Sequence, residues 1–152
     1  MANSNFADWQ FADVFTTAKG AKTCLLTFGD KQPVIYVPAD PQSAPFGFSS
    51  WEDNPRKNLE LRCSAEVEKL FMQFDDWART YLLDNSERIF KKSLTAEQIA
   101  DNYKSPLRKN AGYPALLRTK ANTSGPNKIR LWDEHGAAMD EEPTDWKPVQ
   151  CV

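Results

Sequence analysis

The sequence predicts an α+β fold in which two helices are inserted into an antiparallel β-barrel or curved sheet. Short β-prone runs occupy residues 8–37 and 59–63, an amphipathic stretch follows over residues 64–82, and β-prone runs return after residue 113. Strands therefore precede and follow a helical middle, which is the order of an α+β domain. The length of 152 residues suits one domain, which we expect to span residues 1–152.

The N-terminal runs have the spacing of a three-stranded antiparallel meander. Trp9, Phe11 and Phe15 alternate with other residues, as in a half-buried strand. Residues 23–28 and 34–37 supply two more apolar runs, separated by the turn signals around Gly20 and Gly29.

A proline-punctuated loop over residues 38–55 follows and carries three aromatic residues. Such a loop is either held to the core by its aromatics or presents them to a ligand. We therefore expect a set of loop contacts, which continues into two basic residues after the loop: Phe46, Phe48, Trp51, Arg56 and Lys57.

Two helices are predicted by their capping residues and apolar spacing. Ser64 is a suitable N-cap for a helix whose apolar residues recur at i, i+3, i+4 and i+7 from Val67 to Leu82. Thr95 and Gln98 form a capping-box pattern that opens a shorter helix ending near Tyr103. Adjacent Asp75 and Asp76 project about 100° apart on the first helix, so we interpret them as exposed charges rather than a metal site.

The C-terminal part returns to strands over residues 113–120, 128–132 and 146–152. The last run reaches the chain end, so one alternative is that a C-terminal partner strand or tail is missing. An unpaired strand edge would pair with another copy, which predicts self-association.

The near-neutral charge of -2 conceals two opposed segments. Residues 88–130 hold ten Lys and Arg against two acids, a net charge of +8, whereas residues 133–145 hold six Asp and Glu without a Lys or Arg. The acidic segment is either a solvated loop or a competitor for the basic region.

Cations neutralise nucleic-acid phosphates, and exposed aromatic faces stack on unpaired bases. The basic segment contains both, which favours a single-stranded nucleic-acid interface, and the loop over residues 103–114 is its strongest candidate. The predicted contacts are Lys91, Lys92, Tyr103, Lys104, Arg108, Lys109, Tyr113, Arg118, Lys120, Lys128, Arg130 and Trp132.

Other classes of function lack support in the sequence. No nucleotide-binding or hydrolase motif is present, so we expect no enzyme and no cofactor. Three dispersed cysteines and one histidine make a metal site improbable and indicate reduced thiols. No signal peptide or membrane-spanning run is found, which predicts an intracellular protein that is neither secreted nor bound to a membrane.

Several segments together resemble viral and phage single-stranded-DNA-binding proteins, across about half the chain from residue 44 to residue 120. The resemblance rests on Ala44-Pro45-Phe46-Gly47, Asn58-Leu59-Glu60-Leu61-Arg62, Phe74-Asp75-Asp76-Trp77-Ala78, residues 103–108 and Tyr113-Pro114-Ala115-Leu116-Leu117-Arg118-Thr119-Lys120. It implies an OB-like barrel with helical insertions that binds single strands during replication or recombination.

The residues leave DNA and RNA open as ligands. They also leave an alternative in which the chain is a structural or protein-interaction module, such as a virion or assembly component, with the aromatic loop as its contact surface.

Overall fold

The computed structural model describes residues 6–29, 31, 42–50, 54–133, 135–146 and 149–151. These residues belong to two compact units. Unit 1 comprises Met1–Tyr36 and Lys69–Ser105, and unit 2 comprises Val37–Glu68 and Pro106–Val152. The single domain expected from the sequence stays a prediction.

Unit 1 begins with one long antiparallel hairpin, interrupted in its middle. β1 pairs with β4, and β2 pairs with β3 nearer the turn. Gly20 adopts a φ of 80° at that turn, where the Gly20 amide donates to the Thr17 carbonyl oxygen. The elements are the 3-10 helix η1 (Phe6–Asp8), β1 (Trp9–Phe11), β2 (Phe15–Thr16), β3 (Lys22–Thr23) and β4 (Leu26–Phe28). Two strands of the expected meander are thus present in divided form, and the third, residues 34–37, lies outside the described residues.

The predicted long helix is α1 (Ala65–Asp84). Its N-cap is confirmed, because the Val67 amide donates to Ser64 Oγ at 3.3 Å. In unit 1 its apolar face packs against the hairpin, and the Trp77 ring lies 5.7 Å from Phe6 and 5.6 Å from Phe11. This half-buried aromatic cluster joins α1 to the N-terminal segment of unit 1.

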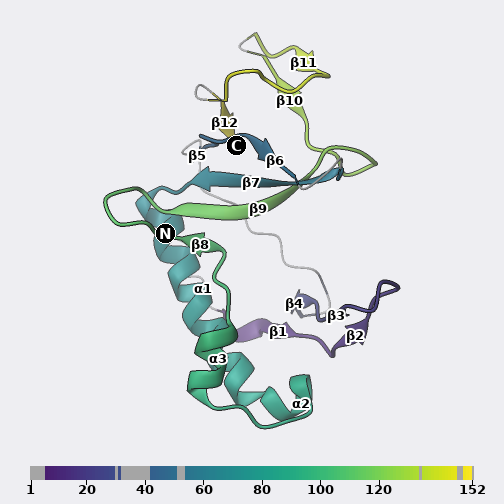
Figure 1. Cartoon of the computed structure of the whole chain (residues 1–152), viewed down its shortest axis with the longest axis vertical. Coiled ribbons are helices and arrows are strands. Elements are labelled where there is room, and N and C mark those ends of the chain that lie inside the picture. Colours follow the sequence, from purple (N-terminus) through teal and green to yellow (C-terminus); the bar gives the residue numbers. More distant parts are fainter. Residues whose placement is uncertain are drawn as a thin grey trace. The chain divides into compact units, whose positions relative to one another are not determined.

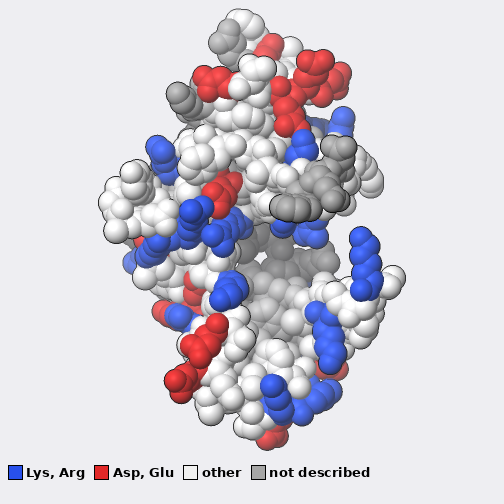
Figure 2. Space-filling view, in the orientation of Figure 1, with Lys and Arg blue, Asp and Glu red and all other residues white. Residues whose placement is uncertain are grey.

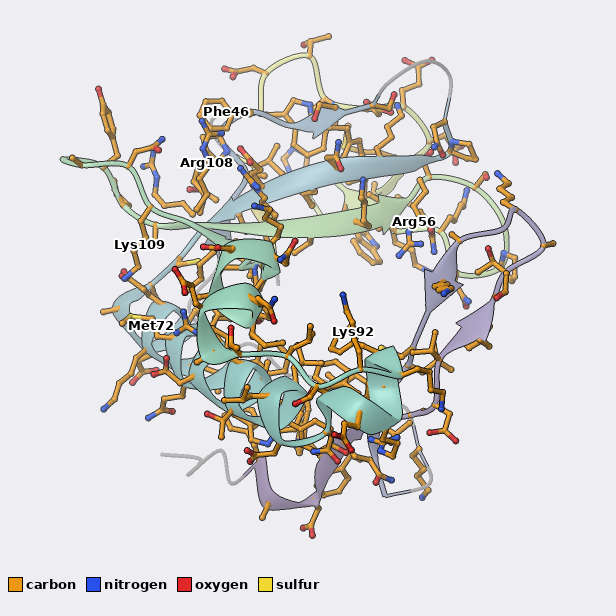
Figure 3. The ribbon with its side chains drawn as sticks, turned by 60° about the horizontal axis from the view of Figure 1, so that its bottom comes forward. Phe46, Arg56, Met72, Lys92, Arg108 and Lys109 are labelled. Carbon is orange, nitrogen blue, oxygen red and sulfur yellow. The ribbon has the colours of Figure 1, made fainter. Side chains whose placement is uncertain are left out.

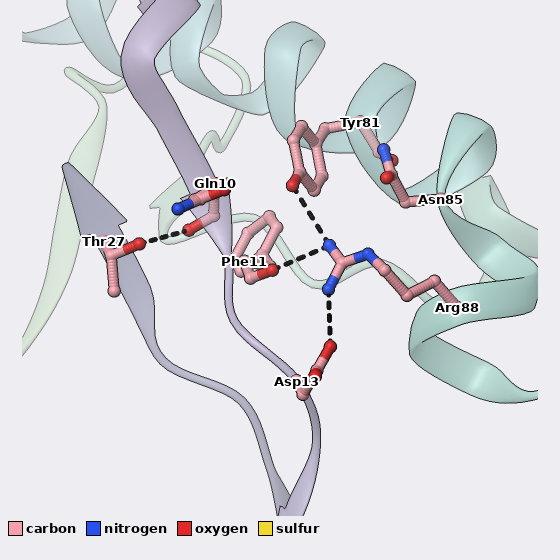
Figure 4. Close-up of polar contacts among 7 residues, drawn as sticks. All are labelled: Gln10, Phe11, Asp13, Thr27, Tyr81, Asn85 and Arg88. Atoms are coloured by element: carbon pink, nitrogen blue, oxygen red, sulfur yellow. Dashed lines mark hydrogen bonds and ion pairs between the residues drawn. The ribbon is translucent and has the colours of Figure 1, made fainter. Parts of the chain in front are cut away.

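The described residues form three α-helices rather than the expected two. The additional helix, α2 (Ser86–Phe90), ends at Lys91, whose positive φ of 59° stops it. Arg88 fixes α2 to the hairpin: its guanidinium donates to Asp13 Oδ1, the Phe11 carbonyl oxygen and the Tyr81 hydroxyl (Figure 4). Sequence reading missed α2 because five residues are too few to establish a helical period.

The second predicted helix is α3 (Ala96–Asn102), and its capping box is confirmed. The Gln98 amide donates to Thr95 Oγ1 at 3.2 Å, and the Thr95 amide donates to Gln98 Oε1 at 3.0 Å. No helix in the described part of the chain combines the length and apolar character needed to cross a membrane.

Unit 2 is built on a four-stranded antiparallel sheet of order β6-β7-β9-β8 (Figure 1). Its long central strands, β7 and β9, pair along seven residues each. Two smaller pairs, β10 with β11 and β12 with β5, complete the unit. The strands are β5 (Gln42–Ser43), β6 (Phe48–Ser49), β7 (Arg56–Arg62), β8 (Leu107–Arg108), β9 (Leu116–Asn122), β10 (Leu131–Trp132), β11 (Ala138–Met139) and β12 (Gln150–Cys151).

The expected α+β class is confirmed, whereas an OB-like barrel is not. Within the described residues the strands form separate antiparallel sheets that do not close into a barrel. The run predicted over residues 128–132 is a strand only at Leu131–Trp132, and the supposedly irregular loop 103–114 contains β8. The terminal strand, expected from residue 146, is β12, and β5 is its partner.

Candidate nucleic-acid interface

The register of the four-stranded sheet of unit 2 separates its side chains onto two faces. Directly opposed residues of an antiparallel pair project to the same side, and neighbours along a strand project to opposite sides. Arg62, Glu60, Asn58 and Arg56 of β7 therefore share a face with their β9 partners. This face carries Ser49, Arg56, Asn58, Glu60, Arg62, Arg108, Leu116, Arg118, Lys120 and Asn122.

We call this side the basic face, defined by Arg56, Arg62, Arg108, Arg118 and Lys120 around Glu60. All five cationic residues are exposed. Figure 2 shows Lys and Arg side chains gathered over β8 and β9, whereas Asp and Glu gather over β10 and β11. The face therefore has five positive charges against one negative charge, a far stronger imbalance than the whole chain has.

The cations are held by a few polar contacts across the strands. Arg118 Nε donates to Glu60 Oε1 at 3.4 Å, and Arg108 Nη1 lies 3.6 Å from the same oxygen. Lys120 Nζ donates to Asn58 Oδ1, its partner on β7. Each guanidinium has five N–H donors, so Arg108 and Arg118 retain donors for an anionic ligand.

The opposite face of the sheet is mainly apolar and includes Leu117 and Ala121, which are buried in the core of unit 2. We call it the apolar face. It comprises Phe48, Lys57, Leu59, Leu61, Leu107, Leu117, Thr119 and Ala121. The Phe48 ring lies 4.6 Å from the Trp146 ring, and Lys57 Nζ lies 5.7 Å from the Phe48 centroid. Phe48 and Lys57, both expected loop contacts, are thus placed away from the basic face and packed within the unit.

One residue of the acidic segment, Glu142, contacts the side of the sheet opposite the basic face. Glu142 forms an ion pair with Lys57. Lys57 is opposed to Ala121 and so belongs to the apolar face. Of the two sequence interpretations, the described contact does not support competition between residue 142 and a ligand on the basic face.

Three predicted aromatic contacts are exposed: Tyr113 is 77% exposed, Phe46 66% and Trp132 55%. Tyr113 lies in the loop between β8 and β9, and Phe46 and Arg108 lie toward one end of the sheet, opposite Arg56 (Figure 3). Trp51, the third aromatic residue of the predicted loop set, lies outside the described residues. Stacking on bases requires an accessible ring, so Tyr113 and Phe46 are the strongest candidates beside the basic face.

The remaining predicted cations are distributed over both units. Lys91, Lys92 and Lys104 are exposed on unit 1. In unit 2, Lys109 Nζ lies 2.6 Å from Glu68 Oε1, and Lys128 and Arg130 are exposed between β9 and β10. The continuous basic segment of the sequence therefore does not form one described surface.

Tyr103, predicted as a stacking residue, is instead held within unit 1. Its hydroxyl donates to Asp75 Oδ1 at 2.7 Å, and Ser105 Oγ donates to the other Asp75 oxygen. Asp75 is only 8% exposed, so the interpretation of an exposed pair is wrong for this residue. Asp76 is exposed and pairs with Arg79 at 2.6 Å.

Burial, the hydrogen bond to Asp75 and the Asp75 charge all raise the pKa of Tyr103 above its ordinary value of 10.0. The neutral phenol is thus favoured in the folded state, and its stabilising effect is complete below pH 10 and lost as pH rises beyond it. Y103F should lower the unfolding free energy by about 1–2 kcal/mol at pH 7.

The difference in unfolding free energy between the unchanged protein and Y103F should become smaller above pH 10. Urea unfolding from pH 7 to pH 11 measures it. Y113F is the matched control, because Tyr113 is exposed and should change stability little. A difference between Y103F and the unchanged protein that stays constant to pH 11 would contradict this role of the Tyr103 hydroxyl.

The principal residue that sequence reading missed is Arg62. The alternation of residues 56–62 already placed it on the same side as Arg56, Asn58 and Glu60. It was overlooked because charge was counted along one segment rather than across paired strands.

The described cysteines and potential metal ligands can be assessed as alternatives to the basic face. Cys24 and Cys63 are half-buried, and burial raises the pKa of both thiols. Among the described residues, no three His, Cys, Asp or Glu side chains come together as metal ligands.

Comparison of the chain with protein-family models, with curated proteins and with solved structures finds no match.

Proposed function

We propose that this chain binds single-stranded nucleic acid, DNA in the first instance, through the basic face of unit 2. The observation that carries the proposal is the set of five exposed cations on one sheet face, which also carries Leu116, whereas the other apolar side chains of these strands lie on the opposite face. The charge of this face is of the sign that phosphates require.

The spacing along the strands supports binding of an extended polymer. Same-face residues on a strand are separated by roughly 6.6 Å, which is twice the rise per residue. On β9, Arg118 and Lys120 are such neighbours. On β7, Arg62 and Arg56 are three such steps apart, with Glu60 and Asn58 between them. The β9 pair therefore suits two successive phosphates of a strand lying along the sheet.

Exposed rings in two loops of the same unit favour single strands over duplexes. Tyr113 and Phe46 present faces on which unpaired bases can stack, each worth roughly 1–3 kcal/mol. Bases in a duplex are already stacked on one another. The proposed setting, replication or recombination, rests on the resemblance to viral and phage strand-binding proteins, and self-association remains a further prediction.

The test is a fluorescence titration of labelled oligonucleotides over a series of salt concentrations, with duplex DNA and RNA as competitors. We expect micromolar or tighter binding at low salt, with log K falling by about 0.7 per log unit of salt for each phosphate neutralised. Duplex of the same length should compete weakly. Absence of binding at low salt would overturn the proposal and favour the alternative of a protein-interaction module.

A further inference from the structure

A single acidic side chain, Glu60, lies within the basic face. Its side chain is 21% exposed, and its Oε1 atom contacts two arginines, Arg118 at 3.4 Å and Arg108 at 3.6 Å. Among the described residues that the register assigns to this face, it is the only one with a negative charge.

The position of Glu60 follows from the pairing of three strands. Glu60 of β7 is directly opposed to Arg118 of β9. Arg108 of β8 is opposed to Leu116, two residues before Arg118, and so reaches the same carboxylate diagonally. The carboxylate is thus fixed between the two guanidiniums by the sheet register.

Such a contact contributes little to stability, since solvent screens the partly exposed guanidiniums of Arg108 and Arg118 and ion pairs at a protein surface are weak. The Glu60 carboxylate should affect the binding of a phosphate more than it affects the stability of the fold. The carboxylate cancels one of the two positive charges beside it and repels an approaching phosphate, while it occupies few of the available guanidinium donors.

We propose that Glu60 is a positioning residue that limits affinity: it holds Arg108 and Arg118 together and offsets part of their charge, so that a bound strand is released readily. This inference rests on the proposed function and assigns one residue of the same face a role in regulating it. A chain without this charge should bind more tightly and with greater sensitivity to salt.

The decisive variant is E60Q, which removes the charge and keeps the shape. We expect its Kd for a labelled oligonucleotide to fall roughly threefold to tenfold at low salt. The salt slope should steepen by about 0.7, because one more cation is left to neutralise phosphate. E142Q is the matched control: it makes the same change in net charge within unit 2, but Glu142 pairs with Lys57 of the apolar face.

The mechanism is tested by repeating E60Q in an R108Q/R118Q background, where its gain should fall below twofold. E60S removes the same charge with a smaller side chain and should also tighten binding. It replaces E60Q as the test if E60Q folds poorly. Unchanged or weaker binding of E60Q, or an equal gain in E142Q, would overturn the role of Glu60 alone. Failure of the unchanged protein to bind would overturn the proposed function instead.

Discussion

Replacing Arg62, Arg108 and Arg118 together by glutamine should weaken oligonucleotide binding by roughly 500-fold at 0.05 M salt and roughly 30-fold at 0.2 M. The three arginines meet where β7, β8 and β9 lie side by side, within the basic face. Their loss should therefore weaken binding more than the replacement of any other three cationic residues.

The magnitude follows from counterion release. Each cation that neutralises a phosphate of a single strand contributes about 0.7 to the slope of log K against log salt. Three lost contacts lower that slope by about 2, so the effect is large at low salt and shrinks as salt rises. The measurement is the same fluorescence titration, carried out at four or more salt concentrations.

The control is K19Q/K22Q/K31Q, which removes three positive charges from unit 1, outside the basic face. The slope of log K against log salt for this control should stay near that of the unchanged protein. Thermal unfolding of both triple variants, followed by circular dichroism, checks that each is folded. Equal loss of binding in the two triple variants would mean that overall charge, not the basic face, determines affinity. That result would contradict the proposed location of the site.

Local features of the fold were predictable because their causes are local. Ser64 and the Thr95–Gln98 pair cap helices through side chains a few residues away, and both caps are present in the structure. The strand around residues 59–63 was predicted by its alternation and is longer, at Arg56–Arg62. The pairing partners of the strands were not predictable in this way, since register depends on residues far apart in the chain.

The candidate site depended on that missing information. Arg118 and Lys120 were predicted as contacts, and Arg56 was predicted only as part of a separate loop set. Arg62, which the register places on the same face, belongs to a strand far earlier in the chain and was missed. A segment-based count of charge joined Arg118 and Lys120 instead to Lys91 and Lys92, which belong to the other unit. Tyr103 was predicted as a contact because its sequence neighbours are polar and basic, a pattern that did not reveal Asp75 as the partner of its hydroxyl.

G47A should lower the unfolding free energy of unit 2 by about 2–4 kcal/mol, which is a large share of the stability of an ordinary domain. Gly47 is buried with a φ of +61°, and a Cβ built on it would lie 2.5 Å from Trp146 Cδ1. The left-handed backbone costs alanine about 1 kcal/mol, and overpacking adds about 1–3 kcal/mol. Because Trp146 packs on Phe48, the expected damage reaches the apolar face that supports β6 and β7.

The steric part can be separated with G125A in the same unit. Gly125 has a φ of +80° with open space around a built Cβ, so alanine there meets the backbone cost alone. Urea dependence of amide hydrogen exchange in β7 and β9 should show G47A as less stable than G125A by about 1–3 kcal/mol. In a W146A background the two glycine variants should become nearly equal, because the ring that opposes the new methyl group is gone. Equal destabilisation in the presence of Trp146 would show that the indole yields to the methyl group and does not fix the loop over residues 44–47.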